Sequence, residues 1–108
     1  MSGWRLMQGD TLVGELHAEG CDMPWFRYRF APGPGWERVR ELFERLETTP
    51  SGPDPEPKLR AAVAVQAEEL RLVAVGFDEP DLAVWRGGTC LLIDGDAARL
   101  RYSVPGGL

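Results

Sequence analysis

Apolar and polar residues alternate along the start of the chain, and a period of two predicts β-strands. We expect strands over residues 4–8 and 12–17. A three-residue loop over 9–11 places Trp4 opposite Leu16, so that both side chains face the core, whereas a tight turn at Gly9-Asp10 would mix core and solvent residues on one face. The hydrophobic pattern therefore favours the longer loop.

The clearest alternation follows Pro24, over residues 25–30, and predicts a third strand. Its aromatic rings and guanidinium groups point to opposite faces of the sheet, so we assign the rings to the core and the guanidinium groups to solvent. This separation argues against a single-stranded nucleic acid groove, where bases stack on aromatic rings beside basic side chains. The inward set is Phe26, Tyr28 and Phe30, and the outward set is Trp25, Arg27 and Arg29.

Helical spacing replaces this alternation after a Pro- and Gly-rich break. Apolar residues recur every three to four positions over residues 36–47, which predicts a helix with a charged outer face. Residues 48–57 are rich in proline and small polar residues, and we expect a mobile loop there. A second helix follows. The stripe expected to face the core comprises Leu59, Val63, Gln66 or Ala67, and Leu70.

Residues 71–77 predict a fourth strand, and residues 82–102 predict a three-stranded antiparallel meander. Gly87-Gly88 and Gly95-Asp96 would form its two turns, because both dipeptides tolerate the positive φ of a tight hairpin. The first turn pairs Arg86 with Thr89, Val84 with Leu91 and Leu82 with Ile93, and the second pairs Ile93 with Ala98, Leu91 with Leu100 and Thr89 with Tyr102. The outer face then carries two mixed rows, Trp85, Cys90, Arg101 and Ala83, Leu92, Arg99.

Together these elements predict an α+β domain in the order β-β-β-α-α-β-β-β-β. We expect a largely antiparallel sheet of about six to seven strands with two helices packed on one face. Residues 1–108 should form a single domain, because 108 residues that are 44% hydrophobic and 27% charged can fill one core. Residues 104–108 are expected to be a frayed tail.

The formal net charge of -5 makes nucleic acid an unfavourable partner, because an acidic chain repels phosphate backbones unless its basic residues are segregated. No apolar run approaches the roughly 18 to 20 residues of a membrane span, and the first residues lack the apolar core of a signal peptide. We therefore expect a cytoplasmic protein that does not enter membranes. There, Cys21 and Cys90 would be thiols rather than a disulfide.

The sequence contains no pattern that assigns a catalytic residue, a metal site or a cofactor. His17 lies near Glu15 and four residues before Cys21, but no catalytic partner is identifiable for it, and near a strand end the side chains of His17 and Cys21 need not meet. The acidic segments 78–81 and 94–96 have the composition of turns rather than of a calcium loop. Glycine motifs for phosphates or dinucleotides are absent. The sequence favours a protein that is not an enzyme, although it leaves this question open.

Four short segments carry a resemblance to other proteins: Trp4-Arg5-Leu6, Asp22-Met23-Pro24-Trp25, Leu42-Phe43 in the first predicted helix, and residues 93–98 with Arg101. As a set that spans most of the chain, they resemble a family of small uncharacterised actinobacterial proteins. The resemblance implies an actinobacterial source and a shared fold. Because that family has no established activity, the resemblance transfers no functional residue.

Two function hypotheses use the same outward-facing residues. The first is a non-enzymatic binding or regulatory domain that recognises a protein partner through the sheet face that the helices leave uncovered. The second is a small-molecule or anion-binding protein, or an enzyme, in which paired arginines hold a phosphate or carboxylate between the sheet and the loop at 48–57. A plain solvated sheet covered by arginine stems is the remaining interpretation. The candidate binding residues are Trp25, Arg27, Arg29, Trp85, Arg99 and Arg101.

The predicted sheet also bears on self-association. A strand edge that neither helix covers presents unpaired backbone groups, and two copies pairing there about a twofold axis would give a homodimer. The hydrophobic pattern does not show which strand forms that edge. The oligomeric state therefore stays open at this level.

Overall fold

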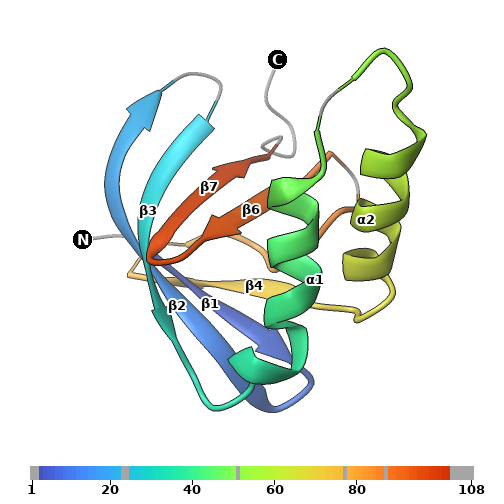
Figure 1. Ribbon diagram of the computed structural model, residues 1–108. Helices are drawn as coiled ribbons and strands as arrows, with labels where there is room; N and C mark the ends of the chain where they lie inside the picture. Colours follow the sequence, from blue (N-terminus) through green and yellow to red (C-terminus); the bar gives the residue numbers. More distant parts are fainter. Residues whose placement is uncertain (1–2, 23–24, 51, 77, 87, 103–108) are drawn as a thin grey trace.

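The computed structural model describes residues 3–22, 25–50, 52–76, 78–86 and 88–102. In this part of the chain it contains seven strands and two helices in the predicted order, so the α+β class is confirmed (Figure 1). The predicted tail at 104–108 lies outside the described residues. The elements are β1 (Gly3–Gln8), β2 (Thr11–Asp22), β3 (Trp25–Pro32), α1 (Trp36–Thr48), α2 (Glu56–Gln66), β4 (Arg71–Val75), β5 (Leu82–Ala83), β6 (Cys90–Asp94) and β7 (Ala97–Arg101).

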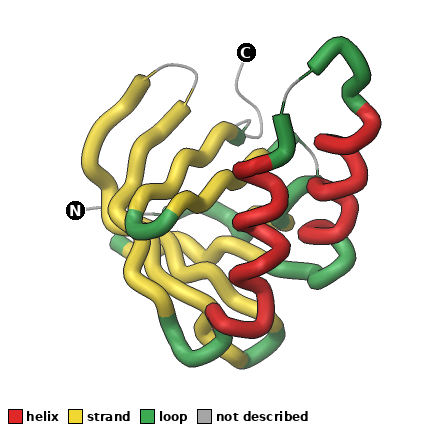
Figure 2. The backbone as a smooth tube through the Cα atoms, in the orientation of Figure 1, coloured by secondary structure: helices red, strands yellow, loops and turns green. Residues whose placement is uncertain are grey.

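The strands form one antiparallel sheet in the spatial order β5-β4-β1-β2-β3-β7-β6. The two hairpins at the start of the chain occupy the middle of the sheet, and later strands add to both edges. The sheet is curled, and the two helices lie together on one side of it (Figure 2). Because α1 packs against α2, β6 and β2, the helices and the curled sheet enclose a single core.

The first hairpin has the predicted register but a different turn. Trp4 lies opposite Leu16, as the hydrophobic pattern requires, yet Gln8 pairs with Thr11, so the predicted three-residue loop is wrong. The connection is the tight turn Gly9-Asp10. A β-bulge leaves Val13 without a partner in β1 and shifts the register by one residue. The bulge thus supplies the extra residue that the pattern had assigned to the loop.

Strand β3 faces the way its alternation predicts. Tyr28 and Phe30 are buried, whereas Arg27 and Arg29 are exposed. Gly14 of the neighbouring β2 allows the Phe30 ring to lie directly on the backbone, since a Cβ atom at position 14 would overlap that ring. The sheet can therefore pack a large aromatic side chain without spreading its strands.

Helix α1 presents its predicted apolar face to the core. The Trp36 ring contacts the rings of Phe30 and Phe43, with centroid distances of 4.7 and 5.6 Å, and so joins the helix to β3. The loop between the helices covers residues 49–55, which is shorter at both ends than predicted. Its expected mobility stays a prediction. The buried residues of α1 are Trp36, Val39, Phe43 and Leu46.

Helix α2 turns a different face to the core from the one predicted. Leu59 and Val63 are each 58% exposed, whereas Ala61 and Val65 are buried. The prediction fails because α2 carries apolar residues on two sides, and the side with the smaller Ala61 allows a closer approach to the rest of the protein. Leu70, the last residue of the predicted stripe, is buried but lies beyond the helix.

The second half of the predicted meander is confirmed. Strands β6 and β7 form a hairpin in which Ile93 pairs with Ala98 and Leu91 pairs with Leu100. Gly95 has a φ of +62°, the left-handed conformation for which glycine was expected in this turn. The ladder ends before the predicted pair of Thr89 and Tyr102, because β6 begins at Cys90.

The first half of the meander is wrong. Strand β5 pairs with β4, at the opposite end of the sheet from β6. Gly87 of the predicted turn lies outside the described residues. The N–H of Thr89 donates to the carbonyl of Arg86 at 3.0 Å, but the flanking residues do not form a hairpin. The pairs that do not form are Val84 with Leu91 and Leu82 with Ile93, together with the outer neighbours Trp85 with Cys90 and Ala83 with Leu92.

The pairing of β5 with β4 explains the curl of the sheet. Strands β5 and β6 follow one another in the chain but occupy opposite edges, so residues 84–89 must cross between those edges. Such a short segment can do so only if the edges approach each other. At the end of β4, Phe77 of the predicted fourth strand lies outside the described residues.

Cys21 and Cys90 are not joined by a disulfide, as predicted. Within the described residues, neither helix combines the length and the apolar character needed to cross a membrane. The cytoplasmic location stays a prediction.

Candidate functional site

A groove lies on the outer face of β6 and β7, between these strands, the C-terminal end of α1 and the N-terminal end of α2. Its volume is about 540 Å³, and small-molecule sites usually have volumes of about 300–1,000 Å³. We call it the basic groove. Its lining residues come from β3, α1, α2, β6, β7 and the connecting loops: Trp25, Glu47, Thr48, Thr49, Pro50, Lys58, Trp85, Cys90, Leu92, Arg99 and Arg101.

Two guanidinium groups share one indole ring in this groove. The Cζ atoms of Arg99 and Arg101 lie 5.6 and 5.3 Å from the ring centroid of Trp25. The register produces this arrangement: Phe26 pairs inward with Leu100, so the residues that flank them point outward together. Two cations are therefore held beside each other by the sheet itself.

The positive charge of these two arginines is only partly balanced. Arg99 Nη2 lies 3.2 Å from Glu47 Oε1, and both side chains are partly exposed. Among the described residues, no carboxylate lies within salt-bridge distance of Arg101, whose Nη2 instead lies 3.8 Å from Cys90 Sγ. The basic groove thus contains two guanidinium groups and one carboxylate.

Lys58 adds a third cation and closes the end of α1. Its Nζ atom donates to the carbonyls of Leu46 at 2.6 Å and Thr49 at 3.2 Å. Thr48 Oγ1 donates to the carbonyl of Glu44 at 2.9 Å. These bonds satisfy carbonyls at the negative end of the helix, which would otherwise oppose an anion in the groove.

Trp85 forms a wall of the groove in a strained backbone conformation. Its φ of +62° is unusual for a bulky residue and costs about 1–2 kcal/mol. Three hydrogen bonds hold Trp85 in this conformation. Its backbone N–H donates to the carbonyl of Thr89 at 2.9 Å, and its indole Nε1 donates to the carbonyl of Leu91 at 3.1 Å. Its own carbonyl accepts from Gln66 Nε2 at 2.8 Å. Such fixed strain is typical of functional positions.

The structure divides the six predicted binding residues. Trp25, Trp85, Arg99 and Arg101 line the basic groove, but Trp85 reaches it from a loop rather than from a strand. The Arg27 guanidinium lies over Gly20 of β2, where a Cβ atom would lie 2.8 Å from Nη2. Arg27 instead borders an adjacent hollow of about 320 Å³, on the other side of Arg99.

Arg29 does not contribute to either hollow. It is exposed, and it pairs with His17 of β2 on one side and with Ala97 of β7 on the other. Its position on the same sheet face makes it a useful reference residue.

The basic groove lies where the anion hypothesis expected it, between the sheet and the segment 48–57, because Thr48, Thr49 and Pro50 line it. Glu47 and Lys58, which flank that segment, were not predicted, because helix ends pack beside the sheet only in the folded chain. One weak signal was present, since Lys58 is the only lysine among the twelve basic residues.

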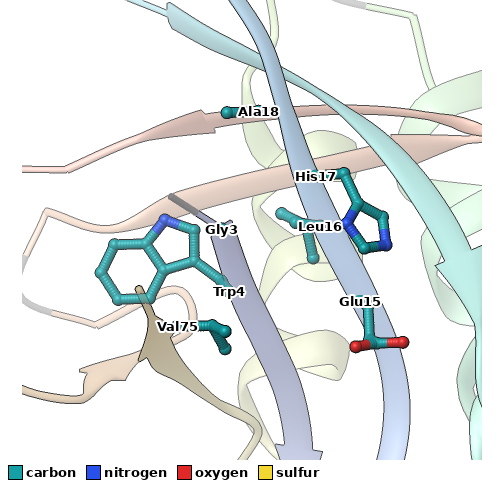
Figure 3. A pocket seen from close by; sticks show the side chains of 7 residues that line it. All are labelled: Gly3, Trp4, Glu15, Leu16, His17, Ala18 and Val75. Atoms are coloured by element: carbon teal, nitrogen blue, oxygen red, sulfur yellow. The ribbon is translucent and has the colours of Figure 1, made fainter. Parts of the chain in front are cut away.

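A second, smaller pocket offers fewer groups that could bind a ligand or take part in catalysis (Figure 3). Its volume is about 90 Å³, and it lies where β1, β2 and β4 meet. Glu15 and His17 lie on the same side of β2 and point away from Trp4, and the other side chains that line the pocket are apolar. It therefore does not support a catalytic role for His17.

No protein-family model, curated protein or solved structure matches the chain. The resemblance to small actinobacterial proteins stays a prediction. The geometry of the basic groove is therefore the basis for assigning a function.

Proposed function

We propose that the protein binds a small organic anion, through a phosphate or carboxylate group, in the basic groove. The observation that carries this proposal is the pair of guanidinium groups over Trp25, for which Glu47 is the one carboxylate within salt-bridge distance among the described residues. Like charges beside each other repel, and an anion would remove this cost. The protein would act as a cytoplasmic binding protein rather than as an enzyme.

The position of Arg101 beside Trp25 supports this function. Its Cζ atom lies 5.3 Å from the ring centroid, so the ring helps to hold the cation in place. The paired N–H donors of a guanidinium group match the two oxygens of a carboxylate or phosphate. Because the ring holds Arg101 before a ligand arrives, less entropy is lost on binding.

The charge distribution supports it as well. The chain has a net charge of -5, yet the groove contains three cations and one carboxylate. A concave site with a net positive charge attracts anions even on a protein whose overall charge is negative.

We favour this function over recognition of a protein partner through a Trp and Arg face. Only some of the six Trp and Arg residues meet at one concave site, since Arg27 borders the adjacent hollow and Arg29 borders neither hollow. The four remaining residues surround a hollow of small-molecule size.

The test is calorimetric titration with inorganic phosphate and with succinate. Arg101→Gln should weaken binding about tenfold or more, because a charge-assisted hydrogen bond contributes about 1.5–3 kcal/mol. Arg29→Gln is the matched control, since it removes the same charge from the same sheet face outside the groove. We expect it to bind like the unaltered protein.

The two cysteines provide an independent measurement. Cys90 lines the groove, whereas Cys21 is exposed and lies outside it. Bound anion should slow alkylation of Cys90 and leave the rate at Cys21 unchanged. Absence of binding to both anions, or equal weakening by Arg101→Gln and Arg29→Gln, would overturn the proposal.

A further inference from the structure

We infer that the ligand is an amphiphile whose anionic head occupies the basic groove and whose single alkyl chain lies along α2. This inference rests on the proposed function and deepens it by naming the class of ligand. It concerns the outward face of α2, which we call the α2 ridge and define by Leu59 and Val63.

The α2 ridge is an apolar surface without a partner in the described structure. Leu59 and Val63 are each 58% exposed and, four residues apart, lie side by side on the helix. A hollow of about 230 Å³ on one side of the ridge is bordered by Ala62 and Trp85. Helices with apolar residues on two sides usually bury both.

The ridge is continuous with the basic groove. Lys58, Ala62 and Gln66 form one stripe along α2, at successive intervals of four residues. Lys58 lines the groove, and the other two residues line the hollow beside the ridge. Trp85 borders both the groove and the hollow, so cationic and apolar surfaces meet at its side chain.

This arrangement fits a single amphiphilic molecule better than a membrane. The other side of the ridge carries Asp54, Glu56 and Arg60, and Arg60 pairs with Glu56 at 2.8 Å. This side therefore has no excess of positive charge to attract an anionic bilayer. A hollow on each side of the ridge also suits a narrow chain that can enter it, whereas a bilayer surface would rest on the ridge alone. The positive groove supplies the complement for the head group.

The experiment is a titration with the alkyl carboxylates acetate, hexanoate and dodecanoate, and with dodecyl phosphate, each below the concentration at which it forms micelles. We expect affinity to increase with chain length, by up to about fourfold for each methylene that becomes buried. Dodecyl phosphate should bind like dodecanoate. The neutral 1-dodecanol should bind much more weakly.

Matched valine substitutions locate the alkyl chain. Val63→Gln should flatten the dependence on chain length while leaving acetate binding unchanged, and glutamine is a good helix former, so α2 should remain folded. Val75→Gln is the control, because Val75 is a second exposed valine, 39% exposed, on strand β4. It should preserve the full chain-length dependence.

The outcomes separate this inference from the proposed function. Equal affinity for acetate and dodecanoate, with Arg101→Gln weakening both, would overturn the amphiphile and leave the anion site intact. Equal binding of 1-dodecanol and dodecanoate, or failure of Arg101→Gln to weaken dodecanoate binding, would also overturn the amphiphile. The proposed function itself would fall only if inorganic phosphate and succinate did not bind, or if Arg101→Gln did not weaken their binding. A different outcome is that the protein co-sediments with phosphatidylglycerol vesicles at concentrations where it does not bind monomeric dodecanoate. If Val63→Gln abolished that co-sedimentation, the ridge would be assigned to a membrane and the inference would be overturned.

Discussion

At the residue scale, the core contains a polar contact between two aromatic side chains. Trp4 Nε1 donates to the hydroxyl of Tyr28 at 3.1 Å, which lets both rings be buried at little polar cost. Burial raises the pKa of Tyr28, and the hydrogen bond from Trp4 opposes this shift in part. Burial also raises the pKa of Tyr102, with a further contribution from the charge of Glu79.

These shifts predict a loss of stability at alkaline pH. Below about pH 10, tyrosines are protonated in both folded and unfolded chains, and the stabilising effect is fully present. Above that pH the unfolded chain releases its tyrosine protons first, so the free energy of unfolding falls as pH rises toward the raised folded pKa values. Urea denaturation between pH 8 and about pH 11 should show this fall.

Tyr28→Phe provides the control for this prediction. It should lower stability by about 1 kcal/mol at pH 8, because it removes the hydrogen bond from Trp4. It should also make the alkaline loss smaller, since one of the two tyrosines no longer titrates. An alkaline loss that is the same in both proteins would contradict the assignment to Tyr28.

At the element scale, α2 shows how tertiary packing chooses between two apolar faces. Leu59 and Val63 form one face, and Ala61 and Val65 form the other. Periodicity alone favours the face with larger side chains. In the folded chain the smaller face packs inward, because Ala61 allows the helix backbone to approach the core closely.

This choice can be measured by substitution. Val65→Ala should lower the free energy of unfolding by about 2 kcal/mol, because it leaves a cavity in a fully buried site. Leu59→Ala removes a larger side chain from an exposed site and should change stability by no more than about 0.5 kcal/mol. The opposite ranking in urea denaturation would show that α2 is rotated the other way.

At the scale of the whole molecule, the curl of the sheet assembles the basic groove from distant segments. Residues of β3, α1, α2, β6 and β7 meet there because β7 pairs with β3 and because α1 packs against both α2 and β6. An acidic protein thereby concentrates positive charge at one place. The groove is open to solvent, so mobile ions should screen its charge.

Screening predicts that phosphate binding weakens with salt. Raising sodium chloride from about 0.05 to about 0.5 M shortens the screening length well below 10 Å. The dissociation constant for inorganic phosphate should then rise several-fold in calorimetric titrations. Arg101→Gln should show a flatter salt dependence, because fewer charges contribute to binding. Salt-independent binding would argue against an electrostatic site.

Local patterns predicted most of the fold. Strand β3, helix α1 and the hairpin of β6 and β7 each follow from a period or a turn signal within a few residues. The first hairpin shows the limit, because a turn and a bulge can together imitate a longer loop. The candidate site was predicted in part: Trp25, Arg99 and Arg101 share a face by alternation alone.

The amino-acid sequence by itself determined the type and order of the elements and which side of the longer strands is apolar. Only the tertiary structure decided that β5 pairs with β4, that α2 turns Leu59 outward, and that Lys58 and Trp85 join the basic groove. The physical reason is the range of the interactions. Periodicity and turn chemistry act between near neighbours, whereas strand pairing and helix facing depend on contacts between residues far apart in the chain.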